Sequence, residues 1–131
     1  MMETQTIKTV RDLKVYRLAY QLAMEVFEAT KTFPKEEIYS LVDQMRRSSR
    51  SVASNIREGY AKRKYEQVFV KHLTHALGSS EETRTWLEFS RDCGYLSAER
   101  VAELDQRYDE VSAMLYGLIS KWQTFEVDSD L

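Results

Sequence analysis

The chain has 131 residues, of which 43% are hydrophobic, and a formal net charge of −2 at pH 7. That length and hydrophobic content suffice for one core, so we expect a single domain over residues 1–131. Four glycines and one proline are too few for the turns of a many-stranded β fold. No long apolar run and no secretory signal pattern is found, which predicts a cytoplasmic protein.

Four helices are expected over about residues 10–123, between loose tails at residues 1–9 and 124–131. The first, residues 12–31, has Asp12 as its N-cap and ends before Phe33-Pro34, since the residue before proline is pushed out of the α region. Its apolar side chains span about 240° of the helical wheel, far more than one bundle requires. The surplus indicates either an unusually central helix or contact with another subunit, and we prefer contact with another subunit.

The second helix is expected to begin at Pro34, to cover residues 35–58 and to end at Gly59 as a C-cap. The third covers residues 64–93, with a thin middle at Gly78 where so long a helix is expected to bend. Each has one apolar seam at helical spacing. The seam of the second is Ile38, Leu41, Met45, Ser49, Val52 and Ile56, and that of the third is Phe69, Leu73, Ala76, Ser80, Thr83 and Leu87.

The fourth helix shows the clearest periodicity of the chain. Gly94 is expected to end the third helix and Ser97 to cap the fourth. A heptad pattern follows, carried by Val101, Leu104, Tyr108, Val111, Leu115, Leu118 and Trp122. Four such helices with short connections pack antiparallel to their neighbours, so the predicted fold is an all-α, up-and-down four-helix bundle.

Charge is distributed unevenly along the chain. Residues 1–75 hold 14 Lys and Arg against 9 Asp and Glu, whereas residues 76–131 hold 5 against 12. The basic half contains a dense cluster that projects away from the apolar seam, and the planar arginine fork matches phosphate oxygens. The candidate nucleic-acid-binding residues are therefore Arg46, Arg47, Arg50, Arg57, Lys62, Arg63 and Lys64, with Tyr60 and Tyr65 as candidate stacking rings.

The basic cluster is equally compatible with two roles that involve no nucleic acid. It could be a solvated helix face that keeps the protein soluble. Its arginines could also pair across a subunit boundary with acids such as Glu81, Glu82 or Glu103. The residue pattern alone leaves all three roles open.

No catalytic, metal or cofactor site is predicted. His72 and His75 lack further metal ligands nearby in sequence, and the lone Cys93 is expected to be a small buried hydrophobe. Adjacent carboxylates such as Glu36 and Glu37 diverge on a helix, and no nucleotide-binding glycine loop occurs. The Arg and His of an all-α RNase of the HEPN type stand closer together than Arg63 and His72 do. We therefore expect a protein that is not an enzyme.

Six short segments, in order and at similar spacing, closely resemble a family of bacterial four-helix-bundle proteins encoded in intervening sequences of 23S ribosomal RNA genes. The likeness covers about residues 12–122. The segments are Asp12-Leu13-Lys14-Val15-Tyr16, Phe33-Pro34 through Leu41, Gln44-Met45-Arg46-Arg47-Ser48, Ser54-Asn55-Ile56-Arg57-Glu58-Gly59-Tyr60, Ala76-Leu77-Gly78-Ser79 and Gly94-Tyr95-Leu96-Ser97.

The resemblance implies a ring-like homopentamer with basic surfaces, and a relation to the accessory protein of diversity-generating retroelements, which binds nucleic acid and a reverse transcriptase. It assigns Arg46 and Arg47 to the family's basic pair, whereas Ala53 stands where many members have proline and Arg57 where a small residue is common. The leading hypothesis is an oligomeric, non-enzymatic scaffold that binds RNA. The alternative is a protein-interaction module that assembles with itself and a protein partner, such as a reverse transcriptase, without nucleic acid.

Overall fold

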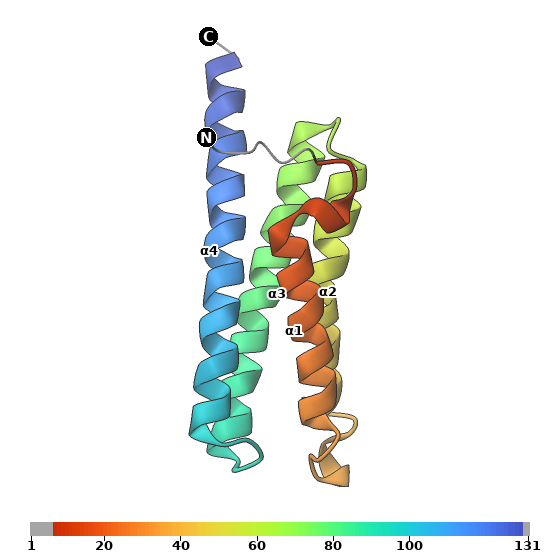
Figure 1. Ribbon diagram of the computed structural model, residues 1–131, viewed down its shortest axis with the longest axis vertical. Coiled ribbons are helices and arrows are strands. Elements are labelled where there is room, and N and C mark those ends of the chain that lie inside the picture. Colours follow the sequence, from red (N-terminus) through yellow and green to blue (C-terminus); the bar gives the residue numbers. More distant parts are fainter. Residues whose placement is uncertain (1–6, 130–131) are drawn as a thin grey trace.

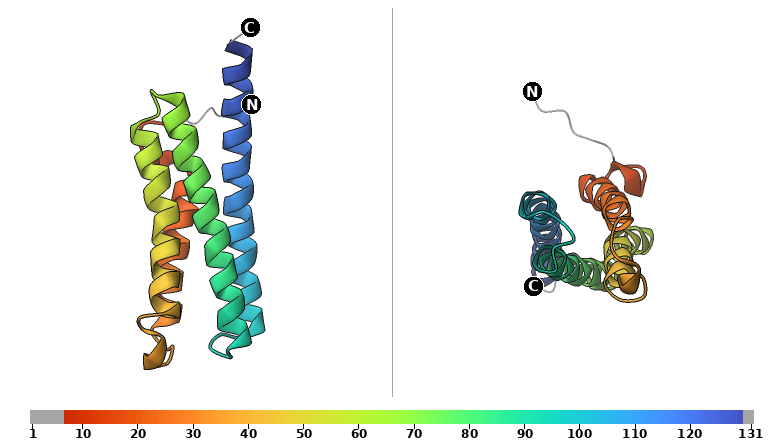
Figure 2. Two further views of the ribbon diagram at one scale, coloured as in Figure 1. Left: turned by 180° about the vertical axis from the view of Figure 1, so that it is seen from behind. Right: turned by 90° about the horizontal axis from the view of Figure 1, so that it is seen from below.

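The computed structural model describes residues 7–129, and the side chains of residues 7–121. Its helices are α1 (Lys14–Thr30), α2 (Leu41–Ala61), α3 (Glu66–Asp92) and α4 (Ala98–Ser129), with 3-10 turns at Val10–Asp12 and Lys35–Glu37. Each helix runs antiparallel to the next, and the four stand around one long axis (Figures 1 and 2). Residues 7–129 contain no strand, which confirms the all-α, up-and-down four-helix bundle.

A single hydrophobic cluster draws side chains from all four helices. The predicted inner face of α3 is buried throughout, and the seam of α2 is buried except for Ile38, which is exposed before the helix begins. On α4 the heptad is buried up to Leu115, Leu118 is partly buried, and Trp122 lies outside the described side chains. The largest fully buried members are Tyr108, Leu22, Met45, Ile56, Leu73, Leu87, Leu104 and Leu115.

The wide apolar arc of α1 is largely used within the single chain. The helix contacts α2 on one side and α4 on the other, so Tyr16, Leu22 and Val26 are all buried. Tyr20 and Met24 remain 46% and 48% exposed. The apolar surface of α1 that the single chain leaves uncovered is therefore limited to these two side chains and their surroundings.

Helix α1 begins two residues later than expected because Asp12 organises the turn before it. The Asp12 carboxylate accepts hydrogen bonds from the backbone amides of Lys8 at 2.8 Å and Thr9 at 2.9 Å. These two bonds, that of Thr9 foremost, hold the pKa of Asp12 below its usual value. The prediction of Asp12 as the N-cap of α1 is therefore wrong, because that position is taken by Leu13.

Helix α2 begins at Leu41 instead of Lys35, and the cause is local hydrogen bonding. Pro34 does not open the helix, because Lys35–Glu37 is a separate 3-10 turn. The Glu37 carboxylate then accepts a bond from the Ser40 hydroxyl at 2.5 Å and a long one from the Leu41 amide at 3.5 Å. This carboxylate weakly satisfies one free amide at the helix start and helps to fix the entry of the chain into α2.

Gly59 does not end α2 but lies inside it, in contact with α3. A Cβ atom at this position would stand 2.8 Å from the Cβ of His72 and 3.3 Å from the ring of Phe69. The helix continues to Ala61, so the prediction of Gly59 as a C-cap is wrong. The glycine is required by the close approach of the two helices and not by a turn.

The connection between α3 and α4 follows the prediction. Gly94 has a φ of 78°, and the amides of Tyr95 and Leu96 both donate to the carbonyl of Ser90. This is the hydrogen-bonded end that glycine gives a helix. The Ser97 hydroxyl accepts the amide of Arg100 at 3.1 Å, which confirms it as the cap of α4.

Small hydroxyl side chains fill the middle of the bundle. The hydroxyls of Ser80 and Ser112 lie 2.8 Å apart, and Thr83 donates to Ser48 at the same distance. Their small volume lets α2, α3 and α4 approach closely, while the bonds satisfy buried polar atoms.

Helix α3 remains helical through Gly78. Of the predicted tails, residues 1–6, 130 and 131 lie outside the described residues, and α4 remains helical through residues 124–129.

Candidate nucleic-acid interface

The seven predicted basic residues are divided by the structure into separate groups. Arg46, Arg50 and Arg57 face the α1 side of α2. Arg47 is largely exposed and pairs with Asp43, one turn earlier on the same helix. The remaining three residues, Lys62, Arg63 and Lys64, lie at the turn between α2 and α3.

Arg46 is a structural residue as much as a surface charge. Its Nε donates to the Thr30 hydroxyl at 2.9 Å, and its Nη2 donates to the carbonyl of Phe27 at 3.4 Å. The guanidinium lies 4.6 Å from the centroid of the Phe27 ring. These contacts join α2 to the end of α1, so Arg46 and Arg47 have different partners in the bundle.

Arg50 and Arg57 line an open groove between α1 and α2. The groove has a volume of about 350 Å³, and most of its wall is apolar. The Arg50 guanidinium lies 5.8 Å from the centroid of the Phe27 ring, and Arg57 donates to the Tyr16 hydroxyl at 3.5 Å. The groove is lined from α1 by Tyr16, Tyr20, Ala23, Met24 and Phe27. We call this feature the α1–α2 groove.

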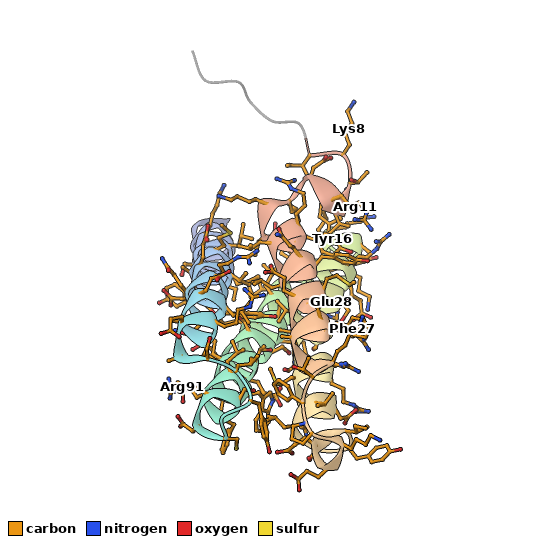
Figure 3. The ribbon with its side chains drawn as sticks, turned by 60° about the horizontal axis from the view of Figure 1, so that its bottom comes forward. Lys8, Arg11, Tyr16, Phe27, Glu28 and Arg91 are labelled. Atoms are coloured by element: carbon orange, nitrogen blue, oxygen red, sulfur yellow. The ribbon has the colours of Figure 1, made fainter. Side chains whose placement is uncertain are left out.

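Two further cations border the α1–α2 groove, and sequence reasoning missed them. The Arg11 guanidinium lies 5.8 Å from the ring centroid of Tyr16 and 5.5 Å from that of Tyr20. At the other end, the Lys31 ammonium lies 4.9 Å from the ring centroid of Phe27. Figure 3 shows Arg11, Tyr16 and Phe27 one after another along the 3-10 turn and α1. The aromatic spacing on α1 was available in the sequence, but only the packing of α1 on α2 brings it beside the arginines.

The turn between α2 and α3 forms a second basic site with Lys62, Arg63 and Lys64, separate from the α1–α2 groove. Arg63 donates to the carbonyl of Tyr60 at 2.9 Å, and its guanidinium lies 4.0 Å from the centroid of that ring. Tyr60 is thus covered by an arginine, whereas Tyr65 is exposed. Lys62 and Lys64 are exposed as well. Of the two predicted stacking rings, Tyr65 is the more open.

The arginines of α3 and α4 differ from the predicted basic residues in their ion pairing. On α3 and α4 every arginine pairs with a carboxylate, as Arg84 does with Asp105 at 2.8 Å. Hydrogen bonding to Asp105 raises the pKa of Arg84 further. Of the seven predicted residues only Arg47 has an ion pair within the described part of the chain. The other six predicted residues therefore carry positive charge that no carboxylate of the described part of the chain neutralises.

Two of the three acids suggested as partners of the arginines are already engaged within the bundle. Glu81 pairs with Arg84 and accepts a bond from Ser112, and Glu103 pairs with Arg100. Among the described contacts Glu82 pairs with no cation, so it alone of the three is available to another subunit.

His72 and Cys93 show no metal-binding arrangement. The His72 Nδ1 lies 3.2 Å from both Asn55 Oδ1 and Glu58 Oε2. Within the described side chains, no three His, Cys, Asp or Glu residues are grouped so that they could hold a metal ion. Cys93 is exposed, so the prediction of a buried thiol is wrong, because the residue lies at the C-terminal end of α3 beyond the core. No helix among the described residues is long and apolar enough to cross a bilayer.

The fold and the groove define an all-α bundle with an arginine-rich side. Comparison with protein families is consistent with that description: the model of the 23S rRNA-intervening sequence proteins matches residues 11–117. The chain belongs to this family, which confirms the resemblance seen in the sequence.

A solved structure shows the same fold. The chain is similar to a protein of unknown function from the S23 ribosomal protein family of Bacteroides thetaiotaomicron, with a TM-score of 0.74 and 24% sequence identity. The match covers 81% of this chain and 95% of that one. Comparison with curated proteins gives no significant match.

Proposed function

We propose that this protein is a non-enzymatic, cytoplasmic, oligomeric scaffold that binds RNA through its basic surfaces. The observation that carries the proposal is the set of six predicted basic residues without a carboxylate partner among the described residues, on a bundle whose arginines in α3 and α4 are all paired. Unpaired guanidinium groups release counterions when they meet phosphates, and this release supplies most of the affinity of non-specific binding.

The proposal divides the predicted basic residues into candidate phosphate contacts and one residue that holds the fold. Arg50 and Arg57 at the groove, and Lys62, Arg63 and Lys64 at the turn, are the proposed phosphate contacts. Arg46 joins α1 to α2, so its removal would weaken the fold as well as the charge.

Assembly would multiply this surface. The resemblance implies a homopentamer, and several basic faces on one particle raise the apparent affinity without any new contact. Light scattering of the purified protein tests this part of the proposal directly. A mass of about one chain would contradict it.

The RNA experiment is fluorescence anisotropy of a labelled RNA over a salt series. Two variants are compared with the native protein: Arg50→Gln/Arg57→Gln, and Lys62→Gln/Arg63→Gln/Lys64→Gln. Each should weaken binding, and the slope of log K against log salt should fall by about 0.7 for each lost contact to a single strand. Lys35→Gln/Lys71→Gln removes two exposed charges elsewhere and should bind RNA as the native protein does. Absence of binding by the native protein at low salt would refute the proposal.

A protein-interaction module is the second candidate, and one feature favours it. A hollow of about 420 Å³ near the start of α2 is lined in part by Tyr39, Trp86 and Phe89. Tyr39 is 95% exposed and Phe89 is 52% exposed, so an apolar partner could cover both. Tyr39→Ser/Phe89→Ser should then lower the oligomeric mass or abolish capture of a reverse transcriptase, while RNA binding by the native protein would be absent.

A further inference from the structure

The α1–α2 groove combines an aromatic wall with a rim of cations. Three of them, Arg11, Arg50 and Arg57, have no carboxylate partner among the described residues, whereas Lys31 pairs with Glu28 at 3.1 Å. Tyr20 and Met24 are about half exposed, and beside them lie Tyr16 and Phe27. Arg11 borders this wall at one end, Arg50 and Lys31 lie by Phe27, and Arg57 bonds to Tyr16. A site for phosphate alone needs only the cations. The exposed aromatic wall between them indicates a ligand that has a flat apolar surface as well as negative charge.

We infer that the α1–α2 groove binds an unpaired nucleobase of single-stranded RNA, with Tyr20 as the stacking ring and Arg50 and Arg57 on the neighbouring phosphates. Unpaired bases stack on aromatic side chains, whereas bases in a duplex are hidden from them. A groove of about 350 Å³ is at the small end of ligand pockets and suits one ring system. The inference rests on the proposed RNA-binding function and names the form of RNA that this site selects.

Charge complementarity disfavours one arrangement of a second copy of the chain at the same place, a two-fold contact of groove with groove. An identical groove would bring its own arginines against Arg50 and Arg57, which have no carboxylate partner within the described residues. Like charges brought together in an apolar contact are costly. An anionic strand instead neutralises them while its base covers Tyr20 and Met24. A contact of the groove with another face of a neighbouring subunit is tested by the light-scattering experiment below.

The test compares three fluorescent probes by anisotropy: single-stranded oligoadenylate, an abasic strand of the same length, and duplex RNA. The abasic strand carries the same phosphates without bases. Native protein should bind oligoadenylate about fivefold or more tightly than the abasic strand, since stacking on one aromatic ring contributes at least that much. Tyr20→Leu should remove this preference and leave binding of the abasic strand unchanged.

Two matched variants distinguish stacking from a general effect of substitution. Tyr20→Phe keeps the ring and should bind oligoadenylate as the native protein does. Tyr116→Leu removes a more exposed tyrosine on α4, away from the groove, and should change nothing. Equal affinity of the native protein for oligoadenylate and the abasic strand, or of Tyr20→Leu and the native protein for oligoadenylate, would overturn the inference.

The outcomes also separate this inference from the proposed function. Salt-dependent binding of every probe without a preference for bases would overturn base stacking and leave RNA binding standing. Failure of every probe to bind would overturn both. Light scattering of Tyr20→Glu tests whether another copy of the chain occupies the groove. An unchanged oligomeric mass supports the inference. A lower mass would show that the groove is a subunit contact and overturn it.

Discussion

The carboxylate of Glu25 on α1 accepts a hydrogen bond from the guanidinium of Arg107 on α4, and so ties the first helix of the bundle to the last. The same carboxylate pairs with Arg100 of α4 at 3.3 Å. The side chains of Glu25 and Arg107 are only 25% and 24% exposed, so the pair is partly shielded from water. A third pair, between Lys14 and Glu110, spans the same two helices at 3.8 Å but is much more exposed.

Replacing Glu25 should cost more stability than replacing an ordinary surface acid. Glu25→Gln leaves the partly buried Arg107 without its carboxylate and Arg100 with only its pair to Glu103, and we expect a loss of about 1–3 kcal/mol in the free energy of unfolding. Glu28→Gln removes an exposed pair with Lys31 and should cost at most about 0.5 kcal/mol. Urea unfolding followed by circular dichroism measures both. Equal losses would show that the link between α1 and α4 adds nothing.

Arg46 should prove more important for stability than its neighbour Arg47. Arg46→Leu removes the bonds to Thr30 and Phe27 together with the contact to the aromatic ring, for an expected loss of about 1–2 kcal/mol. Arg47→Leu removes one exposed ion pair and should stay within about 0.5 kcal/mol of the native value. Thermal unfolding of the two variants distinguishes them. A larger loss for Arg47→Leu would contradict the structural role of Arg46.

Two glycines in helices should respond to alanine in opposite directions. Gly59→Ala places a Cβ atom 2.8 Å from the Cβ of His72 and should destabilise the protein by about 1–3 kcal/mol. Gly78→Ala meets no atom within 4 Å and should stabilise it by about 0.5–1 kcal/mol, because alanine loses less backbone entropy in a helix. The free energies of urea unfolding check both signs. A stable Gly59→Ala variant would mean that α2 and α3 separate at little cost.

The contact between Glu37 and Tyr95 should make stability depend on pH at both extremes. Bonds from Ser40 and Tyr95 lower the pKa of Glu37 from 4.5, so its stabilising contribution is present above that pH and is lost as the pH falls through the lowered pKa. Its carboxylate raises the pKa of Tyr95 from 10.0 to about 12, so that contribution is present below pH 10 and is lost towards pH 12.

Tyr95→Phe isolates the alkaline part of this dependence. The variant should lose the decline in unfolding free energy between pH 10 and pH 12 that the native protein shows, because no phenol remains to ionise there. Urea unfolding at a series of pH values gives the comparison, and Tyr39→Phe is the control because Tyr39 is almost fully exposed. Identical plots of unfolding free energy against pH for the native protein and Tyr95→Phe would mean that the contact between Glu37 and Tyr95 does not contribute to stability.

The exposed thiol of Cys93 should react in the folded protein. Because Cys93 lies at the end of α3 outside the core, a disulfide reagent such as Ellman's should modify about one thiol per chain without denaturant. Cys93→Ala should leave the unfolding free energy within about 0.5 kcal/mol of the native value. A thiol that reacts only after urea is added would show that the assembled protein covers this end of α3.

The sequence predicted helix identity much better than helix boundaries. Apolar residues at spacings of three and four mark the buried face of α3 and α4 whatever surrounds them, so those seams were confirmed. Boundaries depend on side chains that bond to nearby backbone, as those of Asp12 and Glu37 do, and such competing bonds leave no periodic signal. Gly59 was misread for a related reason, since a glycine for close helix packing and a glycine for a helix end look alike in one sequence.

By itself, the sequence determined the all-α bundle, the family and the existence of a basic cluster on the second helix, because periodicity, short motifs and local charge are properties of single segments. Only the tertiary structure decided what each cation contacts. The packing of α1 against α2 turns Arg46 inward to Thr30 and places Arg50 and Arg57 beside the tyrosines of α1. It also adds Arg11 to the same groove. Contacts between helices are long-range in the sequence, so no helical wheel of one helix could have shown them.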